Sequence, residues 1–159
     1  MNSIHQFRVE GLEGQTIDFA AFAGKKILVV NVASECGFTP QYQQLQELQE
    51  HFGEQLVVIG FPCNDFGGQE PGDGAEIRRF CTQRFDITFP LTAKVQIKGE
   101  HKHPIYRWLT AKAENGHSDS MVSWNFQKYL LDENGHLLAV FPPACDPFDP
   151  ALLDYLERF

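Results

Sequence analysis

Two runs of apolar, mostly β-branched residues, at 27–32 and 56–61, constrain the fold of this chain most strongly. Runs of this kind are typical of strands that are buried on both faces of a sheet. Between them, Pro40 is expected at the first position of a helix, and apolar residues follow it at helical spacing, which predicts a helix of about fourteen residues. Those apolar residues are Leu45, Leu48 and Phe52. A strand, a helix and a second strand in this order form a βαβ unit with parallel strands.

The rest of the sequence predicts a single α/β domain over residues 1–159. In chain order, the patterns favour a hairpin at 7–9 and 16–19, helices at 75–84 and 103–112, a hairpin at 126–131 and 136–141 around Asn134-Gly135, and a last helix capped by Asp149. This order is that of a thioredoxin-like fold, with a central mixed sheet flanked by helices. An N-terminal β-hairpin precedes it, and one helix is inserted centrally.

The composition narrows the classes of function. A hydrophobic content of 43% argues against disorder, and a net charge of −8 offers no basic face for nucleic acid or anionic lipid. The N-terminal residues contain no apolar run preceded by positive charge, and no stretch is long enough to cross a bilayer. We therefore expect a cytoplasmic protein without integral membrane association, whose four cysteines stay reduced between reactions.

Cys36 lies at the predicted turn from the first long strand to the following helix. At the N-terminus of a helix, unpaired amide donors and the helix dipole favour a thiolate, which is the nucleophilic form of cysteine. A buried, unreactive cysteine is an equally common outcome. The turn by itself leaves both interpretations open.

Three segments, in order, resemble the signatures of glutathione peroxidases. They are NVASECGFTP at 31–40, GFPCNDFGGQEPG at 60–72 and WNFQKYL at 124–130. Each string is moderately specific, and together they are strong evidence of resemblance. The likeness extends from the opening hairpin to the last helix, and it implies a thioredoxin-like fold, in agreement with the predicted order of elements.

The resemblance implies a catalytic tetrad of Cys36, Gln69, Trp124 and Asn125. Cys36 attacks the distal oxygen of hydrogen peroxide or of an organic or lipid hydroperoxide and becomes a sulfenic acid. Two amides and an indole N–H are neutral donors that would stabilise the thiolate and the charge on the leaving oxygen. Taken singly, the three donors could be a loop residue, a core aromatic and a turn former.

Two positions depart from the pattern of the family. Glu35 stands where many relatives carry a basic residue, and a carboxylate near the sulfur disfavours a thiolate unless it points into solvent. Asp65 stands where glutamine is common. Both departures, and cysteine in place of selenocysteine at Cys36, bear on rate more than on the type of reaction.

Cys81, in the segment FCTQRF at 80–85, matches the resolving cysteine of the thioredoxin-dependent branch of the family. By this resemblance, its thiol condenses with the Cys36 sulfenic acid, and thioredoxin reduces the resulting disulfide. Cys81 also lies on the apolar stripe of its helix beside Ile77 and Phe80, which a purely structural cysteine would do. Because a helical cysteine cannot reach a distant sulfur unaided, we predict that helix 75–84 unwinds during turnover.

Other features define the alternatives. Cys63 is expected to be structural and Cys145 incidental, and the region of Cys145 lacks the arginine that would favour binding of glutathione. Direct reduction by glutathione remains an alternative, as do a peroxide sensor that oxidises a partner protein and a binding module without catalysis. No metal-binding spacing or cofactor motif is present, so we expect no metal and no cofactor. The connection at 112–123 lacks the longer insertion that is associated with tetramers in the family it resembles, so the resemblance implies a monomer.

Overall fold

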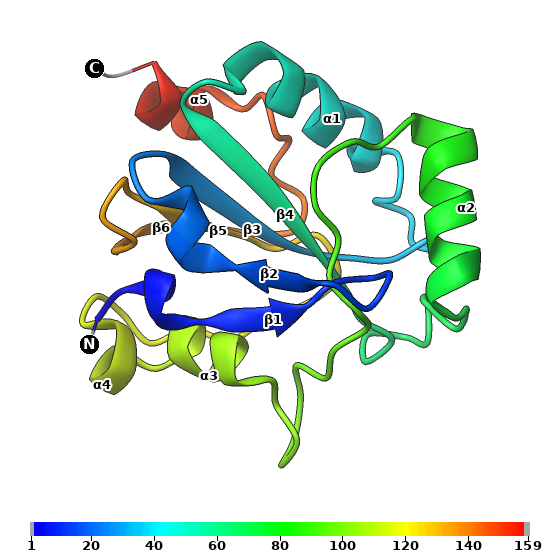
Figure 1. Ribbon diagram of the computed structural model, residues 1–159, viewed down its shortest axis with the longest axis horizontal. Coiled ribbons are helices and arrows are strands. Elements are labelled where there is room, and N and C mark those ends of the chain that lie inside the picture. The colour runs from blue at the N-terminus through cyan, green and yellow to red at the C-terminus, as the bar shows by residue number, and fades with distance from the viewer. Residues whose placement is uncertain (1, 158–159) are drawn as a thin grey trace.

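The computed structural model describes residues 2–157, which are built around a mixed four-stranded sheet (Figure 1). The strand order is β4-β3-β5-β6. The strands are β3 (Lys26–Val32), β4 (Leu56–Pro62), β5 (Lys128–Leu131) and β6 (Leu137–Phe141). β3 and β4 are parallel, as the βαβ prediction requires, and the other two pairs are antiparallel. The predicted α/β class and mixed sheet are confirmed.

The predicted N-terminal hairpin forms a small sheet of its own. β1 (Arg8–Glu10) pairs antiparallel with β2 (Thr16–Asp18). Two short 3₁₀ helices, η1 (Ile4–Gln6) and η2 (Phe19–Phe22), flank this pair. The main chain of Leu12, in the hairpin turn, donates to the Leu91 carbonyl over 3.0 Å, which ties the hairpin to the segment after β4.

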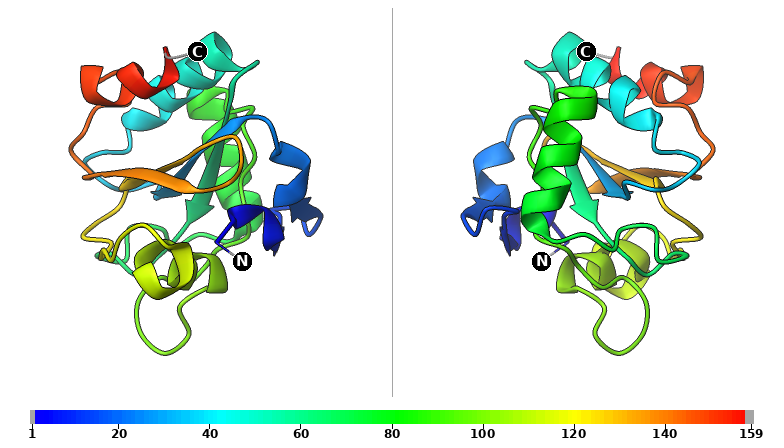
Figure 2. Two further views of the ribbon diagram at one scale, coloured as in Figure 1. Left: turned by 90° about the vertical axis from the view of Figure 1, so that its left-hand side faces the viewer. Right: turned by 90° about the vertical axis from the view of Figure 1, so that its right-hand side faces the viewer.

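Five α-helices surround the main sheet (Figures 1 and 2). They are α1 (Gln41–Phe52), α2 (Gly74–Phe85), α3 (Pro104–Thr110), α4 (Lys112–Asn115) and α5 (Pro150–Leu156). The helix predicted at 103–112 is thus two helices, because Ala111 between them has extended dihedrals of −117° and 114°. Pro40 is the residue before α1, not its first helical residue. Asp149 caps α5 as predicted, by accepting from the Ala151 N–H.

The start of β5 differs from the sequence-based expectation. The apolar pattern predicts a strand from residue 126, but β5 begins at Lys128. Phe126 has a φ of 68°, which is a left-handed conformation that a strand does not contain. This turn carries the preceding Trp124 and Asn125 past the end of β3, where the main-chain N–H of Phe126 donates to the Asn31 carbonyl.

Alternate residues of the central strands pack into separate hydrophobic cores on the two sides of the sheet. Ile27 and Val29 of β3 belong to the core with α3 and the hairpin, whereas Leu28 and Val30 belong to the core with α1, α2 and α5. Trp124 is partly buried and contacts both cores. The second core contains both Cys36 and Cys81, so the sheet places these two cysteines on the same side.

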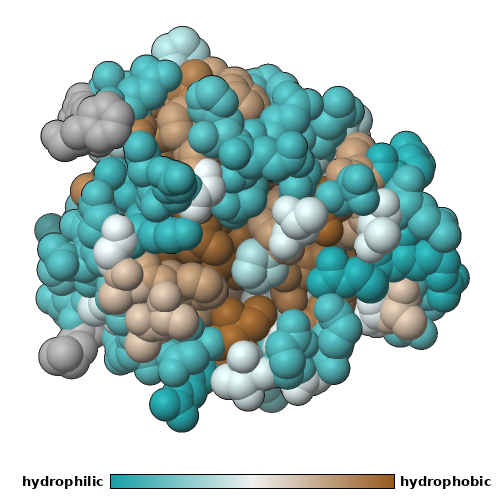
Figure 3. Space-filling model, turned by 45° about the horizontal axis from the view of Figure 1, so that its top comes forward, coloured by the Kyte–Doolittle hydropathy of each residue, from teal (hydrophilic) through white to brown (hydrophobic). Residues whose placement is uncertain are grey.

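The surface agrees with the charge balance of the sequence. On the face shown in Figure 3, hydrophilic side chains cover most of the surface, and apolar side chains are visible in a hollow at its centre. None of the helices described in residues 2–157 combines the length and the apolar character that a membrane span requires.

Candidate active site

Cys36 lies in the loop between β3 and α1, five residues before the helix begins. The loop is fixed by Thr39, whose hydroxyl accepts from the Cys36 N–H over 2.9 Å and donates to the Ala33 carbonyl over 2.9 Å. The Phe38 N–H donates to the Cys36 sulfur over 3.3 Å. This main-chain N–H is directed at the sulfur, and the reactivity of the thiol stays a prediction.

Cys36 is largely buried. The residue is 7% exposed, whereas the next residue, Gly37, is exposed. Glu35 is exposed, so its carboxylate lies at the surface and interacts with the sulfur less than a buried carboxylate would. The acidic departure from the family pattern therefore does not add a buried negative charge next to Cys36.

Gln69 and Asn125 form one hydrogen-bonded unit across the two loops that carry them. Asn125 Nδ2 donates to Gln69 Oε1 over 3.0 Å and to the Phe66 carbonyl over 3.2 Å. The Gln69 carbonyl accepts from the Glu35 N–H over 3.0 Å, which attaches this loop to the residue before Cys36. The structure thus joins Gln69, Asn125 and the Cys36 loop.

Asn125 has a different position in this network from the one that the resemblance implies. Both hydrogens of its side-chain amide are used by Gln69 and Phe66, so they are not directed at the Cys36 sulfur. Because Asn125 donates to the Gln69 oxygen, the Gln69 Nε2 hydrogens point away from Asn125. Among residues 2–157, no hydrogen bond links the sulfur to Gln69, Trp124 or Asn125, and its one donor is the Phe38 N–H.

Trp124 packs against the same loop as Gln69. Its ring meets the Phe66 ring edge to face, with centroids 6.1 Å apart. A Cβ at Gly67, which has a φ of 73°, would lie 2.7 Å from the Trp124 ring. Glycine at 67 is therefore needed both for the left-handed turn and for the close approach of the indole.

Asn31 is a site residue that sequence reasoning missed. It is fully buried in β3, where its Nδ2 donates to the Trp124 carbonyl over 3.1 Å and its Oδ1 accepts from the Gln127 N–H over 3.1 Å. Asn31 thereby places the segment with Trp124 and Asn125 at the end of the strand that leads to Cys36. A signal was present, since Asn31 is the one polar residue in the apolar run at 27–32.

Cys81 lies in the middle of α2 and is 0% exposed. Burial raises the pKa of its thiol to about 11, although the Tyr42 hydroxyl beside it acts in the opposite direction. All four cysteines are free thiols. The helix of Cys81 is fully formed, so the predicted unwinding of α2 stays a prediction.

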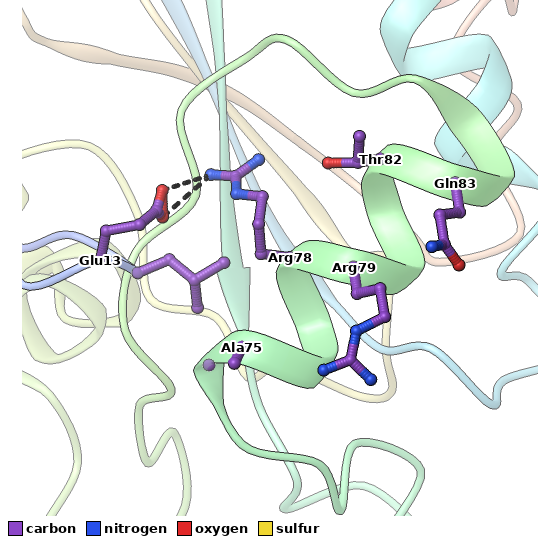
Figure 4. Close-up of a pocket in the computed structure, with 8 residues that line it drawn as sticks. Glu13, Ala75, Arg78, Arg79, Thr82 and Gln83 are labelled. Carbon is purple, nitrogen blue, oxygen red and sulfur yellow. Dashed lines mark hydrogen bonds and ion pairs between the residues drawn. The ribbon is translucent and has the colours of Figure 1, made fainter.

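The ends of α2 are well defined. Asp73 and Glu76 form a reciprocal capping box at its N-terminus, and Asp86 ends it in a left-handed conformation. On its outer face, Arg78 pairs with Glu13 of the hairpin turn over 3.0 Å (Figure 4). A groove of about 640 Å³ lies along this outer face, where Figure 4 shows Arg79 and Gln83. Ile77 and Cys81 are buried on a different face of the helix.

Cys63 and Cys145 lie in different environments. Cys63 packs into the core with α3, on the opposite side of the sheet from Cys36 and Cys81. Burial raises its pKa to about 12, which makes it a poor nucleophile. Cys145 is partly exposed, and burial raises its pKa as well.

Two further polar side chains, those of Asp65 and Lys128, bind main-chain groups of neighbouring segments. Asp65 Oδ2 accepts hydrogen bonds from the N–H groups of Ile97 and Lys98 over 2.6 and 3.0 Å. The carboxylate at position 65 therefore binds the main chain of a neighbouring segment. Lys128 is fully buried, and its Nζ donates to Gln41 Oε1, Pro143 O and Cys145 O. Burial lowers the pKa of Lys128 to about 8. The motif string alone gave no sign of either role.

Fold and site together define a thioredoxin-like α/β protein with a thiol at the end of its central strand. Its fold is shared by solved thiol–disulfide oxidoreductases of much lower sequence identity. A crystal structure of Trgpx in apo form is 29% identical, has a TM-score of 0.74, and is matched over 98% of this chain and 96% of that chain.

Sequence comparison identifies the family. The glutathione peroxidase family model matches residues 4–110. Glutathione peroxidase homolog BsaA of Staphylococcus aureus (strain MW2) is 45% identical over 148 residues, which cover 92% of this chain and 93% of that protein. Hydroperoxy fatty acid reductase gpx1 of Synechocystis sp. is 42% identical over 154 residues, with 92% and 90% covered. The chain belongs to the glutathione peroxidase family.

Proposed function

We propose that this protein is a thiol peroxidase that reduces hydrogen peroxide and organic or lipid hydroperoxides. The observation that carries the proposal is the junction of the Cys36 loop with the Gln69–Asn125 pair, in a chain of this family. The similarity to hydroperoxy fatty acid reductase gpx1 of Synechocystis sp. supports lipid hydroperoxides as substrates.

In the first step, the Cys36 thiolate attacks the distal peroxide oxygen, the O–O bond breaks, and the alcohol or water leaves after taking a proton. The sulfur becomes a sulfenic acid. In the proposal, the Phe38 N–H stabilises the thiolate, and Gln69 Nε2 donates to the leaving oxygen; the hydrogen bond from Asn125 to Gln69 Oε1 supports this orientation of the amide. The indole N–H of Trp124 has no partner among residues 2–157 and is the third donor.

In the second step, the Cys81 thiol condenses with the sulfenic acid, which forms a Cys36–Cys81 disulfide and releases water. Thioredoxin then reduces the disulfide by thiol–disulfide exchange. The location of both thiols in one core supports this pairing, and α2 must open for the two sulfur atoms to meet. We propose a monomer for this reaction.

The test is peroxide consumption with thioredoxin and its reductase, or with glutathione and its reductase. We compare the wild type with Cys36→Ser and Cys81→Ser. The proposal expects thioredoxin-linked turnover in the wild type and its loss in both variants. Full thioredoxin-linked activity of Cys81→Ser contradicts the resolving role.

The raised pKa of Cys81 favours testing a second function as well. A Cys81 pKa of about 11 slows condensation, and a long-lived sulfenic acid is what a peroxide sensor or a glutathione-dependent enzyme requires. A wild type that is oxidised once and recycled by neither reductant favours the sensor. Turnover with glutathione that is independent of Cys81 favours the glutathione-dependent enzyme.

A further inference from the structure

Glu70, the residue after Gln69, is a buried carboxylic acid that the reaction described above does not use. Its side chain is 1% exposed, and its Oε2 has no hydrogen-bond partner in the described part of the chain. Its main chain is fixed, because its N–H donates to Asn64 Oδ1 over 2.9 Å and its carbonyl accepts from Lys94 Nζ over 3.0 Å. An unpaired buried carboxyl oxygen is costly and calls for an explanation.

The carboxyl group lies between the segments that carry the two thiols. Glu70 lines a cavity of about 250 Å³ together with Ser34 and Glu35 of the Cys36 loop. The other side of this cavity is formed by Ile77 and Phe80 of α2, the helix that contains Cys81. Glu70 itself belongs to neither segment, so it can stay in place while α2 rearranges.

Other buried polar atoms around Glu70 also lack hydrogen-bond partners among residues 2–157. They are Ser34 Oγ and Tyr42 Oη. Ser34 interacts with the Glu70 carboxyl, while Tyr42 and Glu70 both interact electrostatically with the Cys81 thiol. The Tyr42 phenol and the Glu70 carboxyl, from two separate elements, thus lie near the second thiol, and the Ser34 hydroxyl lies near the carboxyl.

The condensation step needs a proton acceptor and then a proton donor. With a pKa of about 11, only about one Cys81 in ten thousand is a thiolate at pH 7. Hydroxide is also a poor leaving group from the sulfenic acid unless it is protonated as it departs. Burial raises the pKa of the Glu70 carboxyl, which brings its proton affinity closer to that of the thiol.

We propose that Glu70 transfers the proton in the condensation of Cys81 with the Cys36 sulfenic acid. The carboxylate accepts the proton of the Cys81 S–H, either directly or through the Tyr42 hydroxyl. The resulting thiolate attacks the Cys36 sulfur with its electron pair, the S–O bond breaks, and the departing hydroxide takes the proton from Glu70. The products are the disulfide and one water molecule, and the carboxylate is regenerated.

This role also supplies a reason for α2 to open. Once Cys81 has lost its proton, it is a charged group in an apolar core, which favours its movement toward the Cys36 loop. The other titratable and charged groups around Glu70 come from each neighbouring element. They are Glu35, Tyr42, Glu76, Arg78, Cys81 and Lys94. Lys94 lowers and Glu35 raises the pKa of Glu70. The inference rests on the proposed function, since it assigns a step of that reaction.

The experiment is a single turnover of the reduced protein with one equivalent of hydrogen peroxide. Consumption of peroxide reports oxidation of Cys36, and quenching with an alkylating reagent followed by mass spectrometry reports the disulfide. For Glu70→Gln we expect oxidation of Cys36 within twofold of the wild type and disulfide formation at least tenfold slower at pH 7. Glu76→Gln, which removes a second carboxylate from the same cavity wall, should match the wild type in both steps.

The pH profile separates proton transfer from a structural effect. In the wild type, the rate of disulfide formation should rise through the Glu70 pKa, which burial raises, and then level off. In Glu70→Gln it should rise about tenfold per pH unit toward the Cys81 pKa, because hydroxide replaces the carboxylate. Equal rates and equal profiles in the two proteins overturn the proposal.

Two controls make the result interpretable. If Glu70→Gln does not fold, as judged by circular dichroism, the wild-type profile decides: an acidic inflection supports the role of Glu70, and a continuous rise through pH 9 overturns it. If the wild type forms no Cys36–Cys81 disulfide, it is the proposed function that fails. A disulfide that forms in Glu70→Gln as it does in the wild type overturns the proton transfer alone.

Discussion

The segments that carry Cys36 and Cys81 contribute to the same core, but they give their thiols opposite surroundings. Cys36 lies on a loop fixed by Thr39, with a main-chain N–H directed at its sulfur. Cys81 lies in a regular helix, fully buried, with a pKa raised to about 11. In the reaction that we propose, this difference sets the order of events: Cys36 reacts first, and Cys81 follows only after α2 opens.

The largest effect is expected when the Cys36 thiol is removed. Cys36→Ser should lower peroxide consumption at least about 1,000-fold, since a serine hydroxyl is far less nucleophilic at neutral pH. Cys81→Ser should leave the rate of the first oxidation within about threefold, because the Cys36 loop does not depend on Cys81. Rapid-mixing kinetics with one equivalent of peroxide measures both. An equally large loss of first oxidation in Cys81→Ser would refute the division of roles.

The next effect tests the donors at the first thiol. Gln69→Ala should slow oxidation of Cys36 by about 10- to 100-fold, because it removes the donor that the proposed mechanism assigns to the leaving oxygen. Asn125→Ala should have a smaller effect, on the order of tenfold, since Asn125 orients Gln69 and does not donate to the sulfur. The second-order rate constants give the ranking. A larger loss in Asn125→Ala would show that the amide contacts the reacting atoms directly.

A third effect concerns the pH dependence of stability. Because the folded pKa of Cys81, about 11, is above its ordinary value of 9.0, the folded state binds this proton more tightly than the unfolded chain. The stabilisation is complete below pH 9 and is lost as pH rises toward 11, at roughly 1.4 kcal/mol per pH unit. Urea unfolding of the wild type and Cys81→Ala should therefore converge by roughly 2–3 kcal/mol over that range. A constant difference would contradict the burial of the thiol.

The smallest effect is expected for the ion pair on α2, the helix that carries Cys81. Arg78→Met removes the ion pair with Glu13 that links α2 to the hairpin turn, and its effect on stability should stay below about 1 kcal/mol. If α2 opens during turnover, this variant should show a few-fold faster hydrogen exchange at residues 81–85. Arg79→Met, on the same groove, provides the matched control. Unchanged exchange in Arg78→Met would mean that the ion pair does not restrain α2.

Much of the fold could be predicted because it depends on local pattern. The apolar runs and the helix between them predicted β3, α1 and β4, and Asn134-Gly135 predicted the β5–β6 hairpin. The errors fall where non-local contacts decide the backbone. The left-handed Phe126, whose N–H donates to the Asn31 carbonyl, shortens β5, and no periodicity in the strand predicts such a turn.

The site was also predictable only in part. The order of the motifs predicted its residues, and the structure joins Gln69, Asn125 and the Cys36 loop by hydrogen bonds. The donor direction of Asn125 was not predictable, because it depends on which carbonyl groups surround the amide. The buried, unpaired carboxyl of Glu70 was likewise invisible in the string GGQEPG.

By itself, the sequence determined the α/β class, the order of elements and the family, because hydrophobic spacing, turn residues and motifs are written along the chain. Only the tertiary structure decided which polar atoms have partners, which side of the sheet each cysteine faces, and how burial changes their acidity. Those properties depend on groups far apart in the sequence, since desolvation and hydrogen bonding are set by whatever folding brings within a few ångströms.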